Sequence, residues 1–219
     1  MAGFSSDDLA VMARTFGCGG DLLAVISGSA RHSFAPRGRC LHPTGDDDAT
    51  ILLLAGRAHE LAYGPDGSVM VVHTIGKGEL FGDLLSSASQ GEVRTVVYSR
   101  CGHFTQAALL RLMENYSAVA VAIARQISGK LDAMRARMVE TAMLSATGRI
   151  CAELSRMADA GDDGVISPAP VVSELAVIAR VTRETASRTI SQLLRRGILD
   201  RGEDQLRIVA PHRLRELIV

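Results

Sequence analysis

The sequence lacks cysteines at spacings that bind metal. Its four cysteines, Cys18, Cys40, Cys101 and Cys151, are far apart, and none belongs to a Cys-x-x-Cys motif. Zinc and iron–sulfur sites need clustered ligands, and the six histidines are isolated as well. We therefore expect free thiols, no metal site and no covalent cofactor.

Long hydrophobic runs and catalytic motifs are also missing. No apolar run approaches the ~20 residues that span a bilayer. The N-terminus lacks the basic start and apolar core of a secretory signal. No nucleophile–base motif is visible, so we expect a cytoplasmic protein that is not an enzyme. The chain is 47% hydrophobic and 22% charged, which is an ordinary balance for a globular protein.

Net charge is zero, but the charges are unevenly distributed. Residues 1–100 carry 8 Lys and Arg against 11 Asp and Glu, a net charge of −3, and residues 101–219 carry 16 against 13, a net charge of +3. Between residues 182 and 201 there are five arginines and two acids. A local positive region of this kind suits a nucleic-acid contact.

The most informative segment is a predicted helix from Thr182 to Arg196. Thr182 suits the N-cap position, and a carboxylate at Glu184 is favoured by the helix dipole. Ile190, Leu193 and Leu194 lie on the opposite side from a polar set that covers the first two turns. In a DNA major groove, Arg pairs with guanine and Glu accepts from cytosine. The predicted DNA-binding residues are Thr182, Arg183, Glu184, Ser187 and Arg188.

The flanking sequence favours a helix-turn-helix over the alternative of an ordinary amphipathic helix. Apolar residues in the stretch 171–179 indicate a short preceding helix, and Arg180-Val181 would form the turn. Gly197 is a good helix stop. Beyond it, the stretches 198–199 and 206–209 flank a polar turn and predict a β-hairpin, the wing of a winged helix.

Short β-like stretches separated by Gly and Pro turns dominate residues 22–104. Strands are expected at 51–54, 69–72 and 93–97, in a barrel, roll or sandwich. A capped helix is expected at 5–17, with Ser5 or Ser6 as its cap, and another at 142–159.

The stretch 105–141 lacks turn residues except Gly129 and predicts a long helix. A coiled-coil dimer would cover its apolar stripe, and the alternative is burial against the chain's own β domain. The stripe consists of Tyr116, Ala120, Ile123, Ile127, Leu131, Met134 and Met138.

The helix-turn-helix segment, the wing and Thr147-Gly148-Arg149 together resemble the CRP/FNR family of bacterial transcription regulators. The resemblance covers about residues 22–215. It implies an α+β fold with a jelly-roll-like β-roll sensor domain (1–104), a dimerisation helix and hinge (105–141) and a winged helix-turn-helix (142–219).

The resemblance also implies an effector site in the roll. Family members that bind cyclic nucleotides use a Phe-Gly-Glu turn and an Arg-Ser or Arg-Thr pair, which here read Phe81-Gly82-Asp83-Leu84 and Arg94-Thr95. Glycine and free turn amides would approach a phosphate, with Arg94 adding a charged bond. The alternative is that Arg94 pairs with Asp83 or Glu92 and binds nothing. The predicted nucleotide-binding residues are Gly82, Asp83, Leu84, Arg94, Thr95, Met134 and Arg135.

The sequence departs from the family pattern in this region. Asp83 replaces the usual Glu, and the loop to Arg94 is slightly long. The segment from Arg94 to Asn115 is short, so the last strands of the roll are expected to be trimmed. Met134 and Arg135 replace Thr-Ser on the helix.

The long helix, the helix-turn-helix and the effector site together imply a homodimer that binds an inverted-repeat operator in double-stranded DNA under allosteric control. Thr95 favours cyclic GMP over cyclic AMP as the effector. The alternative is a pocket that is empty or rebuilt for another signal such as cyclic di-GMP. An activator would also contact RNA polymerase.

Overall fold

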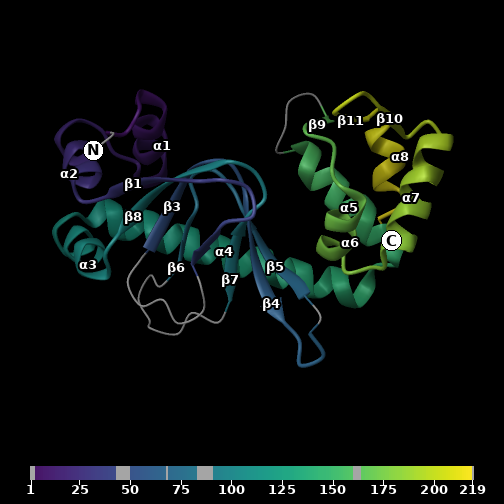
Figure 1. Ribbon diagram of the computed structural model, residues 1–219, viewed down its shortest axis with the longest axis horizontal. Coiled ribbons are helices and arrows are strands. Elements are labelled where there is room, and N and C mark those ends of the chain that lie inside the picture. The colour runs from purple at the N-terminus through teal and green to yellow at the C-terminus, as the bar shows by residue number, and fades with distance from the viewer. Residues whose placement is uncertain (1–2, 43–49, 68, 83–90, 160–163, 219) are drawn as a thin grey trace. The chain divides into compact units, whose positions relative to one another are not determined.

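The computed structural model describes residues 3–42, 50–67, 69–82, 91–159 and 164–218. The chain divides into two compact units, Met1–Ala133 and Met134–Val219. The division falls inside the long helix α4 (Ser117–Met143). Figure 1 shows the strands of the first unit and the helix-rich second unit joined by this helix. Each unit is described by itself.

The first unit is a β-roll of two antiparallel four-stranded sheets, whose strand orders are β1-β8-β3-β6 and β2-β7-β4-β5. This confirms the expected α+β roll. The strands are β1 (Arg31–Ala35), β2 (Cys40–His42), β3 (Thr50–Ala55), β4 (Ala58–Tyr63), β5 (Val69–Ile75), β6 (Leu80–Gly82), β7 (Glu92–Thr95) and β8 (Ser99–Phe104).

Strand β3 is buried on both faces, which explains its continuous run of apolar residues. Ile51 and Leu53 pack inside the roll, whereas Leu52 and Leu54 pack against the helices. Because successive side chains of a strand point to opposite faces, a strand between two cores needs apolar residues throughout. The expected strand at 51–54 is thus confirmed with slightly wider bounds.

Helices cover the outer face of this sheet. They are α1 (Ser6–Phe16), α2 (Gly20–Gly28), α3 (Gln106–Asn115) and the first turns of α4. Ser5 caps α1 in a reciprocal capping box with Asp8, as expected for this segment. Helix α2 was not predicted, although its run Leu22 to Ile26 is apolar. Of the final strands of the roll, β7 has four residues, whereas β8 has six and pairs with both β1 and β3.

The long helical stretch is interrupted at Tyr116, which ends α3 before α4 begins. Ile123 is only 1% exposed and packs in the core of its own unit, and Tyr116 packs against the same core. The alternative of burial against the β domain is therefore correct for this part of the helix. The remaining stripe residues Ile127, Leu131, Met134 and Met138 are exposed.

The second unit contains the end of α4, further helices and a small sheet. The expected helix at 142–159 begins only at Ala146, because α4 continues to Met143 and the Ser145 hydroxyl accepts from the Gly148 amide. The elements are α5 (Ala146–Asp159), β9 (Val165–Ile166), α6 (Val172–Ile178), α7 (Arg183–Arg195), β10 (Leu199–Arg201), β11 (Leu206–Ile208) and α8 (Pro211–Arg215).

One apolar core holds this unit together. Leu154 of α5, Leu175 of α6 and Leu193 of α7 are each at most 1% exposed, and the sheet adds Leu206. Strands β10 and β11 form the expected hairpin, and β9 extends it to the order β10-β11-β9. The winged helix-turn-helix architecture expected here is confirmed.

Among the residues that the structure describes, no single helix is long and apolar enough to cross a membrane. Two sharply bent helix pairs, α1 with α2 and α3 with α4, reach that length and composition only together.

Candidate DNA interface and effector site

Helix α7 begins where its sequence predicts. Thr182 has an extended backbone, and its hydroxyl accepts from the Thr185 amide at 3.2 Å. This bond satisfies one of the amides that a helix N-terminus leaves without a partner. Glu184 lies in the first turn, as the dipole favours.

The two faces of α7 differ sharply. Ala186, Ile190 and Leu193 are at most 3% exposed and anchor the helix in the core of its unit. The opposite face is entirely polar and lines a shallow, open hollow. All of the predicted DNA-binding residues are exposed there or at the cap: Thr182, Arg183, Glu184, Ser187 and Arg188. The structure thus brings this predicted set together.

On this face Arg188 donates to Glu184 at 2.5 Å, across one helical turn. The two side chains are 71% and 79% exposed. Exposed ion pairs of this kind contribute little to stability. Arg188 is therefore able to exchange Glu184 for a base edge or a phosphate, and Glu184 is able to exchange Arg188 for a base donor.

The wing adds two arginines that the predicted set left out. Arg201 on β10 and Arg207 on β11 are exposed, and Arg207 lies opposite Asp200 in the hairpin. The alternation in Leu206-Arg207-Ile208 was the available signal, since it places Arg207 on the face away from the buried neighbours.

Arg149 holds the turn of the helix-turn-helix. Its guanidinium donates to the carbonyls of Ala179 at 3.0 Å, Arg180 at 3.3 Å and Leu144 at 2.9 Å. The sequence pointed to Arg149 only through family resemblance. Two of its partners, the carbonyls of Ala179 and Arg180, are about thirty residues away and belong to the backbone, so they leave no pattern in the sequence.

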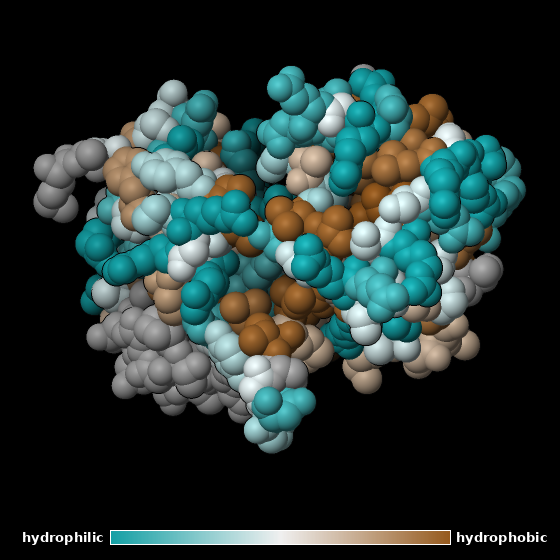
Figure 2. All heavy atoms as spheres, turned by 45° about the vertical axis from the view of Figure 1, so that its right-hand side comes forward, coloured by the Kyte–Doolittle hydropathy of each residue, from teal (hydrophilic) through white to brown (hydrophobic). Residues whose placement is uncertain are grey.

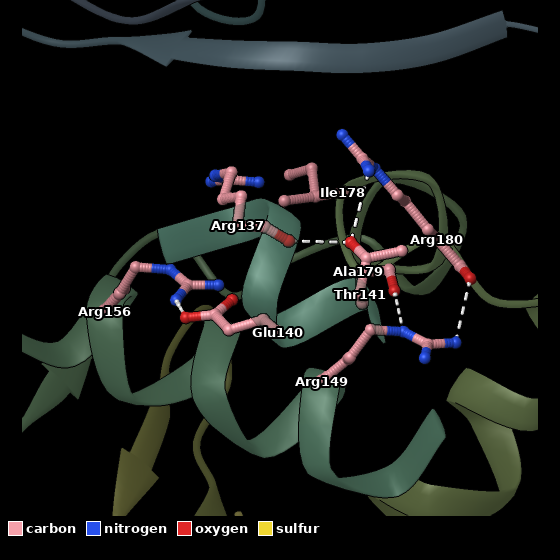
Figure 3. A pocket seen from close by; sticks show the side chains of 8 residues that line it. All are labelled: Arg137, Glu140, Thr141, Arg149, Arg156, Ile178, Ala179 and Arg180. Carbon is pink, nitrogen blue, oxygen red and sulfur yellow. Dashed lines mark hydrogen bonds and ion pairs between the residues drawn. The ribbon is translucent and has the colours of Figure 1, made fainter. Parts of the chain in front are cut away.

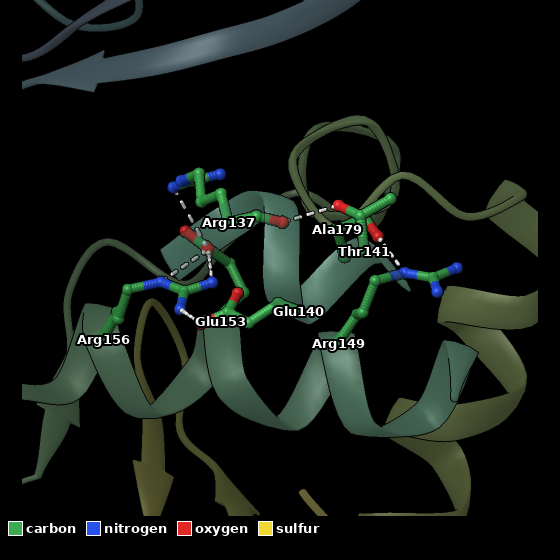
Figure 4. Close-up of polar contacts among 7 residues, drawn as sticks. All are labelled: Arg137, Glu140, Thr141, Arg149, Glu153, Arg156 and Ala179. Atoms are coloured by element: carbon green, nitrogen blue, oxygen red, sulfur yellow. Dashed lines mark hydrogen bonds and ion pairs between the residues drawn. The ribbon is translucent and has the colours of Figure 1, made fainter. Parts of the chain in front are cut away.

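An ionic network lies beside this turn, between the end of α4 and α5 (Figure 4). Glu153 is 4% exposed. It accepts from Arg156 at 2.7 Å and lies 3.5 Å from Arg137, while Arg156 also donates to Glu140 at 2.7 Å. These carboxylates raise the pKa of Arg156 against the lowering effect of burial. A buried carboxylate requires such partners.

The candidate effector turn is only partly described. Gly82 ends β6 with φ +91°, a conformation that favours glycine. Asp83 and Leu84 lie outside the described residues. Anion binding by this turn stays a prediction.

The side chains of Arg94 and Thr95 have different surroundings, and their role in binding an effector stays a prediction. The Arg94 side chain is 50% exposed and donates to Glu92 at 2.8 Å through Nε. Thr95 is 2% exposed; its hydroxyl donates to the Pro36 carbonyl at 2.6 Å and accepts from the Arg39 amide at 2.9 Å. Adjacent residues of a strand point to opposite faces, and the Thr95 side chain is turned away from the exposed guanidinium of Arg94.

Glu92, the partner of Arg94, has a second bond. The Tyr63 hydroxyl donates to it, and this bond is the main reason that the pKa of Glu92 lies below its ordinary value. The bond from Arg94 lowers the same pKa further. The alternative of an Arg94–Glu92 pair is thus present in the structure.

Met134 and Arg135, predicted to face the base of a nucleotide, are both exposed on α4. They belong to the second unit, whereas Arg94 belongs to the first. Met134 continues the exposed stripe of Ile127, Leu131 and Met138.

Among the described residues, the cysteines do not indicate a disulfide or a reactive thiol. The four cysteines all lie in described segments and form no disulfide, and burial raises the pKa of Cys101 to about 12 and that of Cys151 to about 11. A thiol with a raised pKa is a poor nucleophile at neutral pH. In the described parts of the chain, no cluster of three or more His, Cys, Asp or Glu side chains is placed to hold a metal ion.

Comparison with known proteins agrees with the architecture. Residues 148–217 match the family model described as a Crp-like helix-turn-helix domain. No curated protein matches the chain.

Several solved structures share the fold. FixK2 from Bradyrhizobium japonicum has a TM-score of 0.80 at 18% identity, over 87% of this chain and 98% of that one. The c-di-GMP responsive regulator CLP from Xanthomonas campestris has a TM-score of 0.72 at 18% identity, over 85% and 97%. TTHB099, a CRP-family transcriptional regulator from Thermus thermophilus, has a TM-score of 0.72 at 17% identity, over 85% and 96%. The chain has the fold of these proteins, and its residues 148–217 match a Crp-like helix-turn-helix domain.

Proposed function

We propose that this protein, which has the fold of the CRP/FNR transcription regulators, binds double-stranded DNA through α7 and regulates transcription. The observation that carries the proposal is the polar face of α7, opposite a face that is buried in the core. Arg183 and Arg188 supply cations for guanine or phosphate, and Glu184 accepts from cytosine.

Substituting Glu184 tests this base readout. Glu184→Ala should relax specificity at one position of each half-site, at a cost of about 1–3 kcal/mol of discrimination. A randomised-site binding selection would compare the consensus of this variant with that of the unmodified chain. Glu114→Ala removes an exposed acid from α3 and serves as the control. Identical consensus sequences for all three proteins would refute the assignment of Glu184.

The exposed apolar stripe on α4 supports a homodimer. Ile127, Leu131, Met134 and Met138 are between 40% and 71% exposed. They recur at spacings of four, three and four residues, which is the pattern of a coiled-coil seam. Figure 2 shows apolar side chains at the surface of the molecule among hydrophilic ones. A two-fold dimer would read an inverted repeat whose half-sites lie about 34 Å apart.

Sedimentation at micromolar concentration tests the dimer. Ile127→Asp would bury an unpaired charge in the seam, so it should dissociate the dimer and weaken binding to an inverted repeat. Ser128→Asp introduces the same charge at the neighbouring exposed position, which is not part of the stripe, and serves as the control. A monomeric unmodified chain that still bound the operator tightly would contradict the proposal.

Control by an anionic effector is the second part of the proposal. It is supported by the exposed guanidinium of Arg94 and by the left-handed glycine at Gly82. Arg94 would exchange Glu92 for the ligand phosphate, and Thr95 would take no part. Without Thr95 in the site, the argument for cyclic GMP over cyclic AMP no longer holds. The similar fold of CLP, a c-di-GMP responsive regulator, keeps a rebuilt pocket as the alternative.

Titration calorimetry with cyclic AMP, cyclic GMP and cyclic di-GMP separates these alternatives. If Arg94 binds the phosphate, Arg94→Ala should abolish the heat of binding without unfolding the chain. Binding that ignores Arg94→Ala would locate the effector elsewhere. No heat with any of the three ligands at millimolar concentration would refute a cyclic-nucleotide sensor.

A further inference from the structure

A pocket in the second unit is lined mainly by arginines (Figure 3). Its enclosed space is about 10 Å³, roughly what one water molecule needs. A larger group would therefore lie across the mouth rather than inside. The lining residues are Arg137, Glu140, Thr141, Arg149, Arg156, Ile178, Ala179 and Arg180.

The charges around this pocket do not balance. Four arginines line it, and only two carboxylates, Glu140 and the adjacent Glu153, lie within their reach among the described residues. The excess is therefore two positive charges. Both carboxylates are engaged by Arg156, which they bind on two sides.

Two of the arginines are satisfied and two are not. Arg149 is held by three backbone carbonyls, and Arg156 by its two carboxylates. Arg137 is 17% exposed, and its guanidinium makes one long contact of 3.5 Å with Glu153. Among the described residues, the Arg180 guanidinium makes one bond, to the Thr141 hydroxyl at 3.2 Å. A guanidinium carries five N–H donors, so most of these donors remain available.

Arg180 also has an unfavourable backbone. Its φ is +53°, and it is the one residue other than glycine with positive φ in the described parts of the chain. Glycine would adopt this conformation without steric cost, whereas other residues lose roughly 1–2 kcal/mol there. Arg180 therefore occupies a position that its backbone disfavours, which points to a use for the side chain.

We propose that Arg137 and Arg180 bind a phosphate group across the mouth of this pocket, on opposite sides of Ile178. In the view of Figure 3, the side chains of Arg137 and Arg180 lie on either side of Ile178. Two planar guanidinium groups suit the tetrahedral oxygens of a phosphate through charge-assisted bonds.

The bound phosphate connects two parts of the DNA-binding unit. Arg137 belongs to the last turns of α4, and Arg180 lies in the turn between α6 and α7. A ligand that contacts both stabilises the arrangement in which they are close, and so holds the turn before α7 to the end of α4. The phosphate has two sources, a small phosphorylated ligand and the DNA backbone.

Calorimetry on the full chain with inorganic pyrophosphate tests the first source. Ionic strength is held constant, and sulfate at the same concentration checks for unspecific anion binding. Arg137→Gln and Arg180→Gly should each weaken pyrophosphate binding about ten-fold or more, because hydrogen bonds to charged groups are worth that much. Arg180→Gly also relieves the backbone, so its melting temperature should not fall. Arg213→Gln, an exposed substitution on α8, should bind normally.

The salt dependence of DNA binding tests the second source. A lost phosphate contact reduces the slope of log K against log salt by about one. If pyrophosphate binds and the variants lose it, the site takes a free ligand. If pyrophosphate does not bind but both variants reduce the slope, the phosphate is that of DNA. Unchanged pyrophosphate affinity and an unchanged slope in both variants would overturn the proposal. The calorimetric arm contains no DNA, so it holds whether or not α7 reads bases.

Discussion

Helix α7 and strand β7 both carry polar residues that the sequence predicted for binding, yet only α7 presents its set on one face. In α7, Glu184 and Arg188 are four residues apart and touch on the exposed side. In β7, Arg94 and Thr95 are adjacent and point to opposite sides, one exposed and one buried. A helix gathers residues three or four apart, whereas a strand separates neighbours. On a strand, two adjacent residues of a motif are therefore not expected to present their side chains on the same face.

The same contrast divides α4. Ile123 and Ile127 are one turn apart in the same apolar stripe, but Ile123 is 1% exposed and Ile127 is 43% exposed. Periodicity shows which residues share a face. It does not show where the core of the unit stops covering that face, because this depends on strands and helices distant in the chain.

The largest effect should separate the two faces of α7. Leu193 is 1% exposed, so Leu193→Ala should lower the free energy of unfolding by about 2–5 kcal/mol through loss of packing and the remaining cavity. Ser187→Ala on the opposite face should change it by less than about 0.5 kcal/mol. Urea unfolding measures both. Equal costs would mean that the faces are not distinct in solution.

A smaller effect should separate the two side chains of β7. Thr95→Val keeps the shape but leaves the Arg39 amide without its partner. This should cost about 1–3 kcal/mol of stability. Arg94→Ala removes an exposed pair worth at most about 1 kcal/mol. Thermal melting of the two variants would compare them, and a more damaging Arg94→Ala would invert the roles assigned here.

The smallest effect extends the comparison to β8 and to pH. Burial, aided by the charges of Arg31 and His32, lowers the pKa of His103 from 6.5 to about 4. The unfolded chain therefore takes up this proton first as pH falls. Stability from this group is present above pH 6.5 and is lost between about pH 6.5 and 4.

Allowing for partial exposure of the ring, the loss should be on the order of 1–2 kcal/mol. Urea unfolding at about pH 7 and about pH 4.5, on either side of most of this transition, measures it. His103→Gln, which does not titrate, should show a loss that is smaller by this amount. An identical pH dependence in both proteins would mean that His103 is not buried as described.

Local signals predicted much of the fold. The cap at Thr182, the apolar positions of α7 and the polar turn of the wing all act over a few residues, and each is found as expected. The capping box at Ser5 belongs to the same class. Helix α2 was missed because an apolar run with flanking glycines is equally compatible with a strand.

Site geometry was less predictable. The bonds from Arg149 to the turn at Ala179 and Arg180 join residues about thirty positions apart. The contacts of Thr95 with Pro36 and Arg39 join residues that are still farther apart in the chain. Such bonds end on backbone atoms, which every residue type offers. The residue type that provides the backbone atom therefore does not predict such a bond.

By itself, the sequence determined that α7 has one apolar and one charged face, and that this helix follows a short helix and precedes a hairpin. Those properties depend on hydrophobic period, capping and turn chemistry, which are local. Tertiary structure alone decided which part of the α4 stripe is exposed, which way Thr95 points, and that Arg137 and Arg180 line one pocket. Packing between segments that are distant in the chain decides which side chains are buried and which come together. The identities of neighbouring residues do not predict that packing.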